Sequence, residues 1–198
     1  MKKLSKNNTS WAFQVDTIPT FAYKENAFSP EECQQIISLS EKYSFKNAKV
    51  KNDNTFKGRQ SRICWFIPDL DTEWIFRRIT DIILDLNNEY FKFDLYGLHE
   101  GIQFTKYIAP DGEYVKHVDR CINFEIRKLS MSLQLNKPED YEGGELKFFE
   151  DDKGIVAKKE QGTLILFPSF ILHQVTPVTK GERNSLVAWA TGNNFKWL

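Results

Sequence analysis

The sequence has few of the residues that mark disulfide-rich, zinc-binding and membrane proteins. It contains three cysteines in 198 residues, and none lies in a CxxC pair. This argues against both a disulfide framework and a thiolate zinc site. No apolar run approaches the roughly 18 residues of a membrane-spanning helix, and none of signal-peptide length follows the early lysines. We therefore expect a cytoplasmic protein with no membrane partner.

An excess of charge of either sign is also missing. Lys+Arg and Asp+Glu each number 27, so the formal net charge is zero. A general nucleic-acid binder would carry a basic excess, and we expect no nucleic-acid partner. The chain is 41% hydrophobic and 14% aromatic, which is enough to build a folded core. A chain of 198 residues suits one domain, which we place at residues 1–198.

The N-terminal part, about residues 1–98, is predicted to be a helical support. In residues 28–45, Ser29 stands at the N-cap position and Glu32 completes a capping box. Residues 71–91 have apolar side chains at helical spacing behind a polar cap residue. Both segments are therefore predicted to be helices, each with one apolar face.

The polar segment between these helices, residues 44–62, allows two interpretations. It is either a solvated connector, in which Arg59 and Arg62 face water, or a lid beside a binding site, since long loops are often functional. The connector is favoured. The apolar run at residues 63–68 follows as a strand, and Trp65 is expected to lie in the core.

From about residue 99 to residue 192 the hydrophobic period changes to two. Short runs of this kind, separated by turn residues, indicate an antiparallel sandwich, jelly roll or barrel. Helices followed by strands make an α+β chain in which the helices pack on one sheet. In residues 101–107 and 128–136 one strand face is apolar and the other polar. The polar face either meets water or lines a ligand pocket.

His117 and Asp119 are the first candidate pair for chemistry. Residues two apart share one face of a strand, although such a pair also arises by chance in exposed strands. His173, on a later predicted strand, completes a set of two histidines and one carboxylate. That set binds Fe(II) on one side and leaves positions open for other ligands, whereas a structural zinc site is closed. His99 has no partner at ligand spacing, and we expect it to have a structural or surface role.

Arg183 adds a cation to this set. It lies ten residues after His173, beyond a predicted turn at residues 176–182. A hairpin there would return the chain beside the strand of His173. Alternation places Arg183, Ser185 and Trp189 on one face. A guanidinium near an open metal site suits an acidic co-substrate that chelates the metal with its other end.

These elements resemble a known family, the 2-oxoglutarate- and Fe(II)-dependent dioxygenases. The resemblance is to its prolyl 4-hydroxylase-like branch, especially the PKHD-type hydroxylases of bacteria and phages. It is carried by H-V-D at 117–119, by His173 and Arg183, and by Tyr107, ten residues before the first histidine. The resemblance is strong over about residues 95–192. It implies a double-stranded β-helix, or jelly roll, as the catalytic core over 99–192.

The resemblance also implies roles for single residues. His117, Asp119 and His173 match the iron ligands, Arg183 matches the arginine that binds the distal carboxylate of 2-oxoglutarate, and Tyr107 matches a tyrosine that assists it. The positions of Ser185, Gln134 and Trp189 line the pocket. At Gln134 the chain departs from the animal prolyl hydroxylases, which have a tyrosine there.

The implied activity is hydroxylation coupled to oxidative decarboxylation of 2-oxoglutarate to succinate and CO₂. It requires Fe(II), 2-oxoglutarate and dioxygen, with ascorbate as reductant. The expected substrate is a peptidyl proline in a peptide or protein. Three alternatives remain: a small-molecule substrate, a nucleic-acid base, and a non-catalytic jelly-roll binding module. The nucleic-acid demethylases have a second arginine where this chain has Trp189, which disfavours the base.

Overall fold

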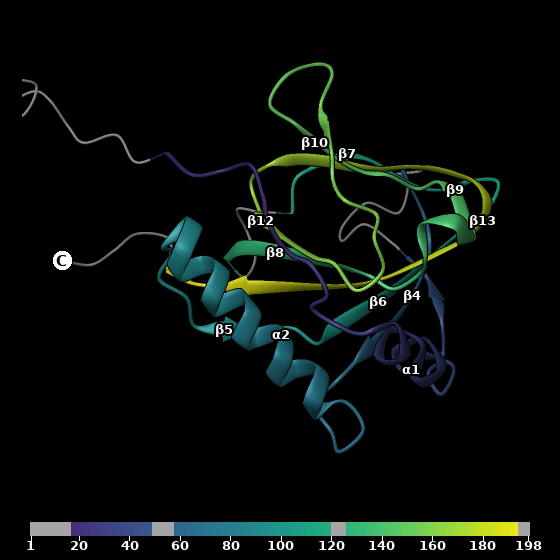
Figure 1. Ribbon diagram of the computed structural model, residues 1–198, viewed down its shortest axis with the longest axis horizontal. Helices are drawn as coiled ribbons and strands as arrows, with labels where there is room; N and C mark the ends of the chain where they lie inside the picture. Colours follow the sequence, from purple (N-terminus) through teal and green to yellow (C-terminus); the bar gives the residue numbers. More distant parts are fainter. Residues whose placement is uncertain (1–16, 49–57, 120–125, 194–198) are drawn as a thin grey trace, which may run out of the picture.

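A computed structural model describes residues 17–48, 58–119 and 126–193 (Figure 1). Within these ranges two antiparallel sheets form the body of the molecule and share one long strand, β13. The larger sheet contains, in spatial order, β1 (Ala22–Lys24), β12 (Leu164–Pro168), β8 (Arg127–Gln134), β13 (Leu172–Thr191), β6 (Ile102–Ile108), β4 (Arg62–Phe66) and β2 (Lys46–Asn47). The strand β5 (Gly97–Leu98) pairs with the end of β13.

The smaller sheet lies at the top of Figure 1, where β7, β9 and β10 are labelled. Its spatial order is β3 (Arg59–Gln60), β7 (Gly112–His117), β13, β10 (Leu146–Phe149) and β11 (Ile155–Val156), and β9 (Tyr141–Gly143) pairs further along β13. Two stacked sheets connected in this way are the jelly roll that the sequence predicts.

The strand β13 corrects one expectation about the path of the chain. The predicted hairpin at residues 176–182 is wrong, because β13 runs through this region without reversing. Its first part pairs with β7 and β10, and from Glu182 onward it pairs with β6 and β8. Gly181 has a φ of +74°, and a Cβ there would lie 2.2 Å from the carbonyl oxygen of Asp140. Glycine therefore permits a bend at a close backbone contact, and the strand crosses from one sheet to the other.

The helix α1 (Pro30–Ser40) begins where the sequence predicts. The backbone N–H of Glu32 donates to Ser29 Oγ at 3.2 Å, and the N–H of Ser29 donates to Glu32 Oε2 at 2.8 Å, so the capping box is formed. The helix α2 (Glu73–Leu86) follows Thr72 and continues into a π-helical turn, η1 (Asn87–Phe91). A short 3₁₀ turn, η2 (Pro138–Asp140), precedes β9.

Both helices cover one face of the larger sheet, below it in Figure 1. Their buried isoleucines pack against apolar side chains of the central strands to form the main core, which includes Ile36, Ile75, Ile79, Phe104, Leu133 and Leu186. The prediction that the N-terminal helices buttress one sheet is confirmed. Among the described residues, no helix is long and apolar enough to cross a membrane.

The N-terminal region contributes more strand than its composition indicates. β4 is the strand predicted from the apolar run at residues 63–68, and it joins the larger sheet together with β1 and β2, while β3 joins the smaller one beside β7. These strands have two to five residues each, too short to show a clear period of two. The pairing of β3 with β7 matters for the site, because it brings Arg59 beside the strand that contains His117.

Candidate active site

A cavity of about 940 Å³ opens between the two sheets. The polar faces of the central strands line it, with Gln103 and Tyr107 from β6, Ser132 from β8, and Arg183 and Ser185 from β13. Of the two interpretations of these faces, the ligand pocket is therefore the one that the structure favours. The alternating apolar side chains of the same strands point toward the helices.

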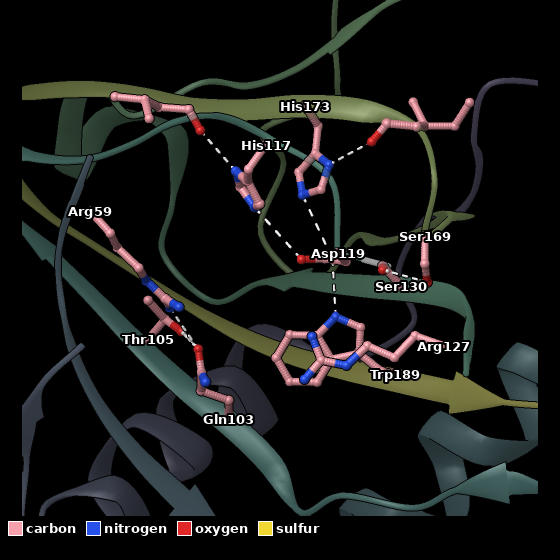
Figure 2. Close-up of polar contacts among 12 residues, drawn as sticks. Arg59, Gln103, Thr105, His117, Asp119, Arg127, Ser130, Ser169, His173 and Trp189 are labelled. Carbon is pink, nitrogen blue, oxygen red and sulfur yellow. Dashed lines mark hydrogen bonds and ion pairs between the residues drawn. The ribbon is translucent and has the colours of Figure 1, made fainter. Parts of the chain in front are cut away.

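His117, Asp119 and His173 meet at this cavity (Figure 2). Their ligand atoms lie within 4.8 Å of one another. His117 Nε2 is 3.6 Å from Asp119 Oδ1, and His173 Nε2 is 3.7 Å from Asp119 Oδ2. The two histidines are direct cross-strand partners of β7 and β13, which explains how residues far apart in sequence come together. Two imidazole nitrogens and one carboxylate that converge in this way fit a non-haem Fe(II) ion.

The outer nitrogens of both histidines are held by backbone carbonyls. His117 Nδ1 lies 2.8 Å from the oxygen of Val115, and His173 Nδ1 lies 2.9 Å from the oxygen of Ile171. A carbonyl only accepts, so each Nδ1 must bear the proton and donate it. The lone pair of each Nε2 therefore points toward Asp119, as in histidines that bind metals.

The charges of the cluster suit a cation. Burial lowers the pKa of His173, which keeps this imidazole neutral. Burial alone would raise the pKa of Asp119, but the positive charge that the neighbouring histidine rings carry when protonated outweighs it and holds that pKa well below its usual range. The site thus presents an ionised carboxylate beside the neutral imidazole of His173, and metal ligands need these protonation states.

Tyr114 stacks on His117, a contact that the sequence pattern did not predict. Their ring centroids are 3.4 Å apart. Residues three apart on a regular strand face opposite sides, but β7 is bulged here. His173 pairs with His117, and Val175 pairs with Tyr114. From the first pair to the second, β13 moves along by two residues and β7 by three. The extra residue turns both rings to one side, and burial raises the pKa of the Tyr114 phenol to about 12.

Trp189 contacts the carboxylate of the cluster. Its indole Nε1–H donates to Asp119 Oδ2 at 3.0 Å, as Figure 2 shows. The guanidinium carbon of Arg127 lies 3.7 Å from the Trp189 ring centre, and Arg127 also pairs with Glu100 at 2.6 Å. The sequence placed Trp189 at the pocket, but only the fold reveals that its N–H orients Asp119.

Arg183 is a buried cation without a counter-charge among the described residues. It is 1% exposed, and no carboxylate of the described ranges forms an ion pair with it. Its Nη2 donates to Gln134 Oε1 at 2.8 Å, its Nη1 lies 3.5 Å from Ser185 Oγ, and its Nε has no hydrogen-bond partner. The guanidinium carbon lies 5.4 Å from the ring centre of Tyr107. A buried, unpaired guanidinium is costly, so this pocket fits a ligand with a carboxylate.

Two residues near the entrance depart from the sequence predictions. Arg59 is not a purely solvated side chain, because its Nη2 donates to Gln103 Oε1 at 2.6 Å and its guanidinium lies over Tyr114. Trp65 is not a core residue: it is 38% exposed, and both it and Arg59 line the cavity. The causes are the pairing of β3 with β7 and of β4 with β6, which a local pattern cannot predict. Residues 49–57, the centre of the segment interpreted as either a connector or a lid, lie outside the described ranges.

Comparisons with known proteins give a consistent result. Residues 102–191 match the 2OG-Fe(II) oxygenase superfamily. A PKHD-type hydroxylase from Prochlorococcus marinus is 39% identical over 164 residues, which cover 80% of this chain and 72% of that relative. The structure of a Pseudomonas putida prolyl-4-hydroxylase aligns with a TM-score of 0.72 and 20% identity, covering 88% of this chain and 94% of that one. A Trichoplax adhaerens prolyl hydroxylase, solved with a peptide fragment of hypoxia inducible factor, aligns with a TM-score of 0.73 and 19% identity, covering 87% and 83%.

A jelly roll with two histidines and a carboxylate at its cavity defines a non-haem iron oxygenase. The chain belongs to the 2OG-Fe(II) oxygenase superfamily and, within it, to the PKHD-type hydroxylases. It is therefore an enzyme of the class that uses Fe(II), 2-oxoglutarate and dioxygen.

Proposed function

We propose that this oxygenase hydroxylates a peptidyl proline, with His117, Asp119 and His173 as the iron ligands. Arg183 receives the distal carboxylate of 2-oxoglutarate, and Tyr107 and Ser185 border that carboxylate. The observation that supports this assignment best is the pairing of two charged features in one cavity. An anionic His–Asp–His cluster, whose ligand atoms lie within 4.8 Å of one another, lines the same cavity as a buried guanidinium whose Nε has no hydrogen-bond partner among the described residues.

When bound, Fe(II) and 2-oxoglutarate supply the oxidising chemistry, which couples decarboxylation to succinate and CO₂ with hydroxylation of the substrate. The chain itself binds and orients. Val115 and Ile171 fix the histidine rings, and Trp189 fixes the carboxylate of Asp119. The cross-strand pairing of Arg183 with Tyr107 places the guanidinium against an aromatic wall.

The choice of proline rests on the cavity entrance and on the solved neighbours. Trp65 and Trp189 have ring centroids 6.1 Å apart, and both line the cavity near the cluster. Aromatic walls of this kind suit the apolar ring of proline in an extended peptide. Two neighbours of the same fold are a prolyl-4-hydroxylase and a prolyl hydroxylase solved with a peptide.

A peptide panel tests this proposal. Purified protein is supplied with Fe(II), 2-oxoglutarate, oxygen and ascorbate as the expected reductant, and incubated with proline-containing peptides and with matched peptides that have alanine in place of proline. We expect succinate formation above metal-free controls and a gain of one oxygen by mass spectrometry on proline peptides alone. Succinate formation without any modified peptide would contradict the proline assignment and direct the search to small molecules. The absence of succinate from folded, iron-supplied protein would contradict the assignment of the iron and 2-oxoglutarate residues.

A further inference from the structure

Gln134 lies on β8 beside Arg183, and both ends of its side-chain amide are engaged. Oε1 accepts from Arg183 Nη2 at 2.8 Å, and Nε2 donates to the carbonyl oxygen of Lys158 at 3.2 Å. A guanidinium only donates and a carbonyl only accepts, so this amide has one possible orientation. The oxygen end of the amide therefore contacts Arg183, while its NH2 group is turned toward the carbonyl of Lys158.

The backbone holds Gln134 as firmly as its side chain. Its N–H donates to Thr163 at 3.0 Å, and its carbonyl accepts from Gly162 at 2.8 Å. On β13 its cross-strand partner is Ser185, so Arg183 lies two residues away on the same face, the diagonal neighbour. Gln134 is 2% exposed. The acceptor that anchors the guanidinium is thus rigid and fully enclosed.

The contact between Gln134 and Arg183 leaves the guanidinium charged, because its acceptor is neutral. An amide oxygen anchors the guanidinium without cancelling its charge, whereas a carboxylate at the same place would form an internal ion pair. The guanidinium has five N–H donors. Its Nη2 donates to Gln134, and its Nε has no hydrogen-bond partner. The positive charge is therefore kept for a ligand.

We infer that Gln134 is a positioning residue, which holds Arg183 in place without neutralising it and so makes the pocket selective for 2-oxo acids with a second carboxylate. This inference rests on the proposed function, in which Arg183 binds the distal carboxylate of 2-oxoglutarate. It assigns Gln134 no direct contact with the co-substrate. The selectivity comes from the charge state that its side chain leaves on the pocket.

Gln134→Glu tests the inference with a change of one atom. Binding of two ligands to Mn(II)-loaded protein is measured by calorimetry: 2-oxoglutarate, and 2-oxopentanoate, which has the same 2-oxo acid head but a methyl group in place of the distal carboxylate. We expect the substitution to weaken 2-oxoglutarate about 10- to 150-fold, the equivalent of one charge-assisted hydrogen bond. The affinity for 2-oxopentanoate stays unchanged, so the preference for the dicarboxylate collapses.

Two further variants separate positioning from general damage. Gln161→Glu is the matched control, because Gln161 Nε2 also donates to a backbone carbonyl, that of Leu135 at 2.8 Å. We expect it to keep the preference of the wild type. Gln134→Leu removes the acceptor and adds no charge, so we expect a smaller loss of 2-oxoglutarate affinity than Glu causes. Thermal denaturation verifies that each variant is folded.

The outcomes distinguish the inference from the function on which it rests. If Gln134→Glu keeps the wild-type preference while Arg183→Met loses it, the inference is overturned and the proposed role of Arg183 stands. Equal weakening of both ligands by Gln134→Glu also overturns it, because that result indicates a merely structural role. If the wild type does not favour 2-oxoglutarate over 2-oxopentanoate, the proposed role of Arg183 fails as well.

Discussion

The two faces of the larger sheet are made from alternating residues of the same strands, and they have opposite properties. The face toward α1 and α2 contains Phe104, Leu133 and Leu186, which are all fully buried and apolar. The face toward the smaller sheet contains Ser132 and Arg183 beside a cavity of about 940 Å³. The helices provide one face with its packing partners, and the other face is left for polar groups whose burial costs stability. We call these the helix face and the cavity face.

The largest expected effect is on the helix face, where Phe104→Ala should lower the free energy of unfolding by about 3–5 kcal/mol, through lost burial and the cavity left behind. Phe104 lies 5.8 Å from the Phe45 ring and 6.1 Å from the Phe66 ring. Urea denaturation measures the change. The control is Ile108→Ala, an exposed position on the same strand. Equal losses for the two variants would contradict the division between the faces.

On the cavity face, Arg183→Met should lower the affinity for 2-oxoglutarate by about 2–5 kcal/mol, the usual cost of removing one partner of a buried charge pair. The stability of the free protein should be unchanged or raised, because the substitution removes an uncompensated buried charge. Calorimetry and urea denaturation measure the two quantities. Arg77→Met, at a side chain that is 75% exposed, is the control. An unchanged affinity would remove Arg183 from the co-substrate site.

Trp189→Phe should weaken binding of Mn(II) or Co(II) about 10- to 100-fold, because partners that orient metal ligands have effects of that size. The ring is kept, and only the N–H that donates to Asp119 is lost. Trp74→Phe is matched to it, since Trp74 Nε1 donates to the carbonyl oxygen of Asp71 at a similar 3.0 Å, away from the cavity. A metal titration that gives equal affinities for the two variants would show that Trp189 does not orient the site.

The smallest expected effect is at the start of α1, where Ser29→Ala removes the N-cap acceptor and should cost about 1 kcal/mol of stability. Because α1 supports only the helix face, affinities for metal and 2-oxoglutarate should stay at wild-type values. Thermal denaturation and calorimetry measure both. A loss of metal affinity would mean that the two faces are coupled more tightly than the packing indicates.

Local patterns were enough to predict the parts of this molecule that depend on near neighbours. The Ser29 capping box and the alternation around Ser132 follow from residues close in sequence. The pair of His117 with Asp119 was also found locally, but β7 ends at His117 and Asp119 lies just beyond it, where its N–H donates to the carbonyl of Ser169, so the two do not meet through strand alternation as predicted. The chemistry of an open iron site indicated the distant partners His173 and Arg183, and the likeness to a known family supported both. These residues come together only through the pairing of strands, and the sequence of a single strand does not predict which strands pair.

The features that were missed depend on register and on strand crossing. β13 was predicted as a hairpin because its middle has turn residues, yet Gly181 there permits only a bend. The stack of Tyr114 on His117 requires a bulge that defeats the period of two. Arg59 reaches the cavity because a two-residue strand pairs with β7. Each of these three features depends on which strands pair with one another.

The central claim is that the His117–Asp119–His173 cluster and Arg183 form one site for iron and 2-oxoglutarate. An anaerobic titration with Fe(II) and 2-oxoglutarate, followed by visible absorbance, tests it most directly. We predict a metal-to-ligand charge-transfer band in the wild type, its loss in Asp119→Ala, and a need for higher 2-oxoglutarate concentration in Arg183→Met. Folded wild-type protein that develops no band, or an Asp119→Ala variant that keeps it, would contradict the claim.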